Sequence, residues 1–283
     1  IAESVIIGEP TELKPIKGHK GYIYVIIELR GERGHSSRPQ KEKSTFHALG
    51  EVINNLKHFE SIMEQISAPD FSPPYPTTNV GVITTDEMKH NGEVVKSSKN
   101  IIPGYCKLEM EIRPVPGQNT EQIFHVLEEM LKEKIGEVTV NVKLARKPTP
   151  PMGTSESSEI IKVAEKLAEQ ETGTVSYNTE GGALNEAGAQ TVIWGPGNIN
   201  QAHKSNEYIE AQYFNSNIFN DFLIQVAVAL LRVGLSGELH DQTEPNIEFT
   251  PFCEEFAHHF HVCKELCFFQ NATYNVVIAG RRR

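Results

Sequence analysis

The stretch that decides the fold is TVIWGPGNINQAHKSNEY, residues 191–208. Its first four residues form a short apolar run bounded by a turn, which predicts a buried strand. The break Gly195-Pro196-Gly197 ends this strand and begins a loop. That loop presents His203, and a histidine at a strand end is well placed to offer a ring nitrogen to a metal. Taken alone, a single loop histidine is more often an ordinary polar residue.

A second short strand, at the other end of the sequence, leads into an acidic residue. Residues 4–7 predict a core strand, and GEPT at residues 8–11 closes it. Glu9 therefore follows the carboxyl end of a strand, which is where α/β folds place their sites. The alternative is an ordinary turn residue ahead of a proline.

The bulk composition limits the classes of function. A length of 283 residues allows one large domain or two ordinary ones. The formal net charge of −10 argues against nucleic acid as a partner, because phosphate-backbone binding needs a basic surface. No apolar run is long enough for a transmembrane helix, so we expect no membrane association. Four cysteines are too few for a disulfide scaffold and predict a reducing, cytoplasmic setting.

The region from residue 17 to residue 146 predicts a domain with its own layer order. Apolar alternation predicts strands, and apolar residues at helical spacing predict helices, with Phe46 on the buried face of the first helix and Thr120 as the N-cap of the second. The expected order is strand 21–30, helix 42–66, strand 77–85, strand 105–113, helix 120–135 and strand 138–144, with a hairpin extension at 92–98. This β-α-β-β-α-β order is the ferredoxin-like arrangement of two helices on a four-stranded antiparallel sheet.

The flanking segments predict an α/β layer interrupted by that domain. After a proline-rich linker, the expected elements are helix 156–170, strand 174–177, a turn and short helix at 179–188, strand 191–194 and helix 216–233. The sequence thus predicts an α/β domain with an inserted α+β ferredoxin-like domain. Its expected segments are 1–16 (first strand and loop of the α/β domain), 17–146 (inserted domain), 147–235 (rest of the α/β domain) and 236–283 (an unassigned tail).

Seven stretches share an order with one known family. They are IIGEPT (6–11), KGHKG (17–21), GERGHSSRP (31–39), PYPTTNVGVI (74–83), NIIPGYCKLEMEIRPVPG (100–117), YNTEGG (177–182) and GPGNINQAHKSNEY (195–208). On these stretches the chain resembles the acetylornithine deacetylase branch of the dinuclear-metal aminoacylase/carboxypeptidase/desuccinylase superfamily. The resemblance implies that the α/β domain is a catalytic domain, with a metal-ligand loop in residues 1–16, and that the inserted domain is a lid or dimerisation domain. It also implies hydrolysis of the amide bond of N-acetyl-L-ornithine to acetate and ornithine, a step of arginine biosynthesis.

The resemblance also implies a metal centre. Glu9 stands where the family places a carboxylate ligand of one metal, and His203 stands where it places the imidazole ligand of the other. Oxygen and imidazole nitrogen suit Zn²⁺ or Co²⁺, and a complete site would hold two ions. Such a pair polarises the amide carbonyl and lowers the pKa of a shared water.

Four further residues receive roles from the resemblance. His35 is expected to stabilise the tetrahedral oxyanion across a homodimer formed through the inserted domain. Asn100 and Arg113 are expected to hold the carboxylate and backbone of a small N-acyl amino acid, and Glu180 to contact its amino group. Singly, each is more often a structural residue, whereas together in the family's order they favour the functional interpretation.

The resemblance is incomplete in one respect that matters for activity. In the family, a His-x-Asp metal motif, a bridging Asp and a Glu-Glu pair come before the stretch that corresponds to residues 6–11. This sequence shows no such segment. We therefore expect an incomplete catalytic layer and very low activity of the chain alone. Two alternatives stay open: a non-catalytic dimerisation or binding module derived from the family, and a hydrolase of the succinyl-diaminopimelate desuccinylase type.

Overall fold

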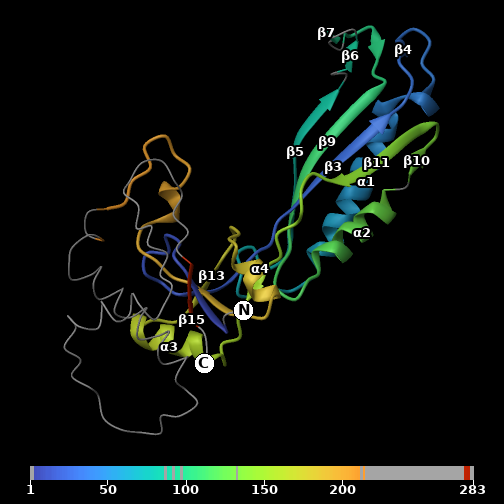
Figure 1. The fold of residues 1–283 in the computed structure, drawn as a ribbon. Helices are drawn as coiled ribbons and strands as arrows, with labels where there is room; N and C mark the ends of the chain where they lie inside the picture. Colours follow the sequence, from blue (N-terminus) through green and yellow to red (C-terminus); the bar gives the residue numbers. More distant parts are fainter. Residues whose placement is uncertain are drawn as a thin grey trace, which may run out of the picture. The chain divides into compact units, whose positions relative to one another are not determined.

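The computed structural model describes residues 3–85, 88–90, 93–95, 98–131, 133–210, 213 and 277–280. The chain divides into two compact units (Figure 1). The first unit comprises Ile1–His19, Met152–Val175 and Thr179–Arg283, and the second comprises Lys20–Pro151 and Ser176–Asn178. The domain boundaries expected from the sequence, after residues 16, 146 and 235, stay predictions.

The second unit is a five-stranded antiparallel sheet with two helices on one face (Figure 1). The strand order is β10 (Lys134–Ile135), β11 (Val138–Leu144), β3 (Ile23–Arg30), β9 (Tyr105–Arg113) and β5 (Thr77–Thr85). The helices are α1 (Thr45–Met63) and α2 (Thr120–Met130). The strands predicted at 77–85, 105–113 and 138–144 are confirmed with the same bounds.

Alternating side chains explain why this sheet is covered on one face only. Successive residues of a strand point to opposite faces, so every second residue of β3 and β9 enters one core with the helices. The other face carries polar and aromatic side chains such as Tyr24, Glu109 and Lys143. Burial of each core side chain stabilises the fold by about 1.5–3 kcal/mol.

Helix α1 is shorter than predicted, and its first turn leaves Phe46 exposed. It begins at Thr45 rather than residue 42, and a short 3-10 turn, Lys41–Lys43, precedes it. The placement of Phe46 in the core was wrong, because 71% of its surface is exposed. The buried face instead carries Thr45, Ala48, Val52, Leu56, Phe59 and Met63. The apolar residues at helical spacing after Phe46 include Leu56, Phe59 and Met63 of this face, so the error is confined to the first turn.

Helix α2 begins at the predicted residue but ends five residues early. The predicted cap Thr120 was wrong: the Asn119 side chain accepts hydrogen bonds from the backbone N–H groups of Glu121 and Gln122, each at 2.9 Å. The predicted last turn instead forms β10, since Gly136 adopts a φ of 60° and turns the chain back into β11.

Two small antiparallel pairs complete the second unit. β4 (Gly34–His35) pairs with β8 (Ile101–Ile102). β6 (Met88–His90) pairs with β7 (Glu93–Val95), so the extension predicted at 92–98 is a hairpin that begins earlier.

The first unit holds a second, mixed sheet. Its order is β12 (Met152–Gly153), β2 (Ile16–His19), β14 (Gln190–Ile193), β1 (Ser4–Ile7) and β15 (Val277–Gly280), with β13 (Gly173–Val175) also paired to β2. β1 and β14 are parallel, and β15 pairs antiparallel with the other edge of β1. Helix α3 (Glu159–Ala168) packs on one face, and α4 (Gly181–Glu186) lies against β12 and β14. β2, β12 and β15 were not predicted.

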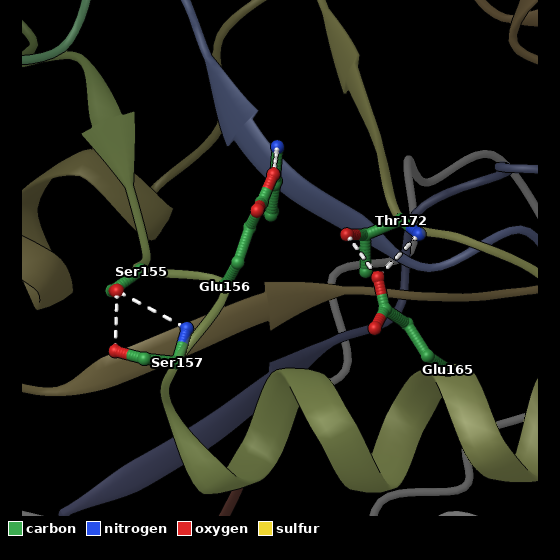
Figure 2. A network of polar contacts seen from close by, with 6 residues as sticks. Ser155, Glu156, Ser157, Glu165 and Thr172 are labelled. Carbon is green, nitrogen blue, oxygen red and sulfur yellow. Dashed lines mark hydrogen bonds and ion pairs between the residues drawn. The ribbon is translucent and has the colours of Figure 1, made fainter.

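Polar contacts fix the two ends of α3, which is shorter than the predicted 156–170 (Figure 2). Ahead of the helix, the backbone N–H of Ser157 donates to the Ser155 hydroxyl at 3.2 Å. At its other end, Glu165 accepts from the N–H and hydroxyl of Thr172 at 2.9 and 2.8 Å. The helix stops because Glu169 adopts a left-handed φ of 53°.

Parts of the sequence prediction lie outside the described residues. These are the helix predicted at 216–233 and the tail from 236, apart from the backbone of Val277–Gly280. Among the helices that the structure describes, none has the length and apolar character needed to cross a membrane.

Candidate functional site

The parallel pairing of β1 and β14 brings two distant loops to the same edge of the sheet. Ile7 lies opposite Ile193, so both strands end together. Beyond them, the N–H groups of Thr11 and Leu13 donate to the Gly195 carbonyl oxygen at 3.1 and 3.0 Å. The loop that carries Glu9 and the loop that leads to His203 are therefore joined by backbone hydrogen bonds.

The contact between these loops requires a glycine. A Cβ atom at position 195 would lie 2.5 Å from the Glu9 carbonyl oxygen, a distance that no side chain tolerates. The neighbouring Trp194 is buried, and its indole N–H donates to the Leu13 carbonyl oxygen at 2.7 Å. The Gly-Pro-Gly break thus ends a strand and also allows the two loops to pack closely.

Glu9 lies beside Glu180 in the first unit. Burial, and then the negative charge of Glu180, raise the pKa of the Glu9 carboxyl to about 7. Glu180 stands at the N-cap of α4, directly after Thr179. The buried His19 accepts a hydrogen bond from the Thr179 N–H at 3.4 Å through Nε2. A half-buried acidic pair of this kind favours a cation or a shared proton.

His203 is exposed and adopts a left-handed φ of 62°. Its backbone N–H donates to the Glu207 carboxylate at 3.0 Å, which closes a tight turn. Among the described residues, no three His, Cys, Asp or Glu side chains gather closely enough to hold a metal ion. The donors that the structure describes do not complete a metal centre, so we derive no chemical step through one.

His35 and Asn100 come together in the second unit through the β4–β8 pairing. The Ser36 N–H donates to the Asn100 carbonyl oxygen at 3.0 Å. The Ser37 N–H donates to Nδ1 of His35 at 3.2 Å, and the Ser37 hydroxyl lies 2.7 Å from the same nitrogen. Because a backbone N–H can only donate, Nδ1 is the acceptor, and the neutral ring carries its proton on Nε2.

Arg113 is held by three neighbours in the same unit. Glu111 accepts from Nε and Nη2 at 3.4 and 3.2 Å, and the Asn178 side-chain oxygen accepts from Nη1 at 3.0 Å. The guanidinium carbon also lies 4.4 Å from the centre of the Tyr22 ring.

Sequence reasoning did not single out Lys20, although it lies within the KGHKG stretch. Lys20 is buried and donates to the carbonyl oxygens of Pro73 and Tyr75 at 3.1 and 2.7 Å. Burial, and then the charge of Arg113, lower the pKa of its ammonium group.

Comparison with known proteins relates the sequence to one enzyme family. Residues 17–139 match the model of the peptidase dimerisation domain. Curated acetylornithine deacetylases match 75% of the chain, with 31% identity for the protein of Myxococcus xanthus, 33% for that of Aliivibrio fischeri and 37% for that of Buchnera aphidicola. The chain is a relative of the acetylornithine deacetylases.

This relative spans about half the length of the curated deacetylases, since the matches cover 54%, 54% and 53% of those three proteins. Solved structures of two peptidases have a similar fold. A tripeptidase of Staphylococcus aureus matches with a TM-score of 0.54 and 20% identity, and the aminopeptidase PepT of Bacillus cereus with 0.56 and 15%. Each alignment covers 78% of this chain and 55% of the solved one.

The fold of this deacetylase relative thus combines a dimerisation domain with a mixed α/β unit, as the sequence predicted in outline. The structure joins the loops of Glu9 and His203, sets Glu180 beside Glu9, and connects Asn100 to Ser36, the residue after His35. Among the described contacts, none links the side chains of Glu9 and His203. The roles of the six predicted site residues stay predictions.

Proposed function

We propose that this chain provides part of a metal-dependent hydrolase that cleaves the amide bond of an N-acyl amino acid, with N-acetyl-L-ornithine as the first candidate substrate. The named activity of the relatives supports the substrate. The observation that carries the proposal is the backbone connection between the loops of Glu9 and His203 at one edge of the parallel β1–β14 pair. Arginine biosynthesis in the cytoplasm is the corresponding setting.

In this proposal Glu9 and His203 each supply one ligand to a centre of two Zn²⁺ or Co²⁺ ions. The acidic pair of Glu9 and Glu180 supports a cation at this edge, because a positive charge there would relieve the repulsion between the two carboxylates. The remaining ligands and the general base would come from outside the residues that the structure describes. When bound, the ions would polarise the amide carbonyl and activate water.

His35 would donate a hydrogen bond to the developing oxyanion. The contacts of Ser37 with Nδ1 leave the Nε2 proton to face outward, and among the described residues no acceptor takes it. A donor already fixed in orientation stabilises an oxyanion without the cost of reorientation.

Arg113 and Asn100 would bind the substrate carboxylate and backbone, and Glu180 its amino group. A guanidinium group has five N–H donors, and the described contacts of Arg113 occupy three. Two donors are left for a carboxylate, and the ring of Tyr22 together with Glu111 and Asn178 fixes their direction.

We also propose a homodimer formed through the second unit, which we assign to the ferredoxin-like class as a lid domain. The order β11-β3-β9-β5, with α1 after β3 and α2 after β9, supports that class. β5 is an edge strand with three exposed apolar side chains: Val80 (36% exposed), Val82 (46%) and Ile83 (50%). An apolar edge strand is a natural template for pairing with a second copy.

Metal stoichiometry and hydrolysis test the proposal together. The purified chain is loaded with Zn²⁺ or Co²⁺, and bound metal and release of acetate from N-acetylornithine are measured. We expect fewer than two tightly bound ions and very slow hydrolysis, with faster turnover once a segment carrying the family's His-x-Asp and Glu-Glu motifs is added. No gain on that addition would favour the non-catalytic dimerisation module. Faster turnover of N-succinyl-diaminopimelate would favour the desuccinylase alternative.

A further inference from the structure

Three cationic side chains, two exposed or half-buried and one buried, lie around Tyr22 in the second unit. The guanidinium carbon of Arg113 lies 4.4 Å from the Tyr22 ring centre, and that of Arg146 lies 4.5 Å from the same point. Lys20 is close enough to Arg113 for the charge of Arg113 to act on it. We call Lys20, Tyr22, Arg113 and Arg146 the cation cluster.

Arg146 differs from Arg30, which also stacks on a tyrosine ring of the second unit. Arg30 lies over the Tyr105 ring at 5.1 Å, and the Glu28 carboxylate faces it at 3.8 Å. Among the described residues, no carboxylate lies within ion-pair distance of Arg146. Of the two arginines, Arg113 alone has a described carboxylate partner, Glu111. A local excess of positive side chains around Tyr22, in a chain whose net charge is −10, indicates an anionic ligand.

The two guanidinium groups are arranged to act together. Both distances are measured to one ring centre, so the separation of the guanidinium carbons cannot exceed their sum. Stacking on an aromatic ring fixes the plane of a guanidinium group, and a fixed plane suits two-point binding of a carboxylate. Arg113 keeps two unoccupied N–H donors, and Arg146 is exposed.

We propose that the cation cluster binds a small molecule with two carboxylates, one on Arg113 and the other on Arg146. The inference rests on the proposed function for the role of Arg113 and adds one point to it: among N-acyl amino acids, those with a second carboxylate, as in the desuccinylase-type alternative, bind more tightly. Arg146 is then a specificity-determining residue.

Two matched ligands test the inference on the full chain without metal. Calorimetry at low ionic strength compares N-succinylglycine, which has two carboxylates, with N-acetylglycine, which has one. We expect the first to bind about tenfold more tightly, because an added charge-assisted contact is worth about that factor. Arg146→Gln should reduce the preference to less than about twofold, and Arg113→Gln should weaken both ligands.

Arg30→Gln is the matched control, because it removes a stacked arginine from the same sheet face, and it should leave the preference unchanged. Arg146→Lys keeps the charge but loses the planar fork, so an intermediate preference is expected. Equal affinity for the two ligands, or the same loss in Arg30→Gln as in Arg146→Gln, would overturn the inference. So would displacement of N-succinylglycine by equimolar sulfate, which would show an unselective anion site.

The same measurements separate this inference from the proposed function. If the chain prefers N-succinylglycine through Arg146 but never gains hydrolytic activity, the result would support dicarboxylate binding by the cation cluster and count against the hydrolase. Hydrolysis by a chain that binds N-succinylglycine and N-acetylglycine equally would overturn only the proposed dicarboxylate binding by the cation cluster.

Discussion

At the scale of single residues, Glu9 connects the candidate site to stability. Its carboxyl has a pKa raised from 4.5 to about 7 by burial and by Glu180, so the folded chain binds a proton that the unfolded chain releases. The free energy of unfolding must then fall as pH rises from about 4.5 to about 7. The full shift corresponds to about 3 kcal/mol, before solvent screening reduces it.

Glu9→Gln should remove this part of the pH dependence in the metal-free chain. An amide needs no proton, so the variant should be more stable than the natural chain at pH 8 and similar at pH 4.5. Urea denaturation at the two pH values measures the difference. Glu64→Gln, at an exposed position, is the control. A variant whose stability follows the natural pH profile would show that Glu9 is not the titrating group.

At the scale of elements, Gly195 tests the connection between the two site loops. Gly195→Ala places a Cβ 2.5 Å from the Glu9 carbonyl oxygen, so the loops must separate. We expect a loss of about 1–3 kcal/mol in the free energy of unfolding, as in other overpacked positions.

Gly50→Ala is the matched control for that substitution. Gly50 lies inside α1, and nothing stands within 4 Å of its added Cβ. Alanine is the better helix former, so this variant should be more stable by up to about 1 kcal/mol. Equal effects of the two substitutions in denaturant titrations would contradict the close approach of the loops.

The cap of α2 gives a second test at this scale. Asn119→Ala removes the acceptor of two backbone N–H bonds and should cost about 1 kcal/mol, whereas Asn119→Ser retains a capping oxygen and should cost less. Thermal unfolding of both variants measures the difference. A larger loss in Thr120→Ala would support the cap predicted from the sequence instead.

At the scale of the whole molecule, the proposed dimer can be tested through the edge strand β5. Ile83→Lys places a charge on the exposed apolar edge and should shift the chain toward the monomer. Light scattering after size-exclusion chromatography, over a range of protein concentrations, reports the mass. Val126→Lys is the control, because Val126 is 41% exposed on α2, away from the edge strand. Equal masses for the natural chain and Ile83→Lys would argue against pairing through β5.

Local patterns explain which elements were predicted well. Alternation fixed the bounds of β9 and β11, because each strand has one face turned to the core and the period of two is present in its own residues. The bounds of β5 were also predicted, although its residues are half-buried or exposed. β2 and β12 were missed, since IKGH and MG carry no such pattern and become strands only by pairing with distant segments. Phe46 was misplaced because the smaller Thr45 and Ala48 take the buried positions of the first turns of α1, which the spacing of large apolar residues does not reveal.

The sequence by itself determined the family resemblance, the strand pattern of the dimerisation domain and the positions of the six candidate site residues. Only the tertiary structure decided that Glu180 lies beside Glu9, that Gly195 meets Glu9, and that Arg146 joins Arg113 over Tyr22. The reason is physical: these groups are far apart along the chain. Local periodicity records which face a residue occupies, whereas strand pairing decides which distant residues that face meets.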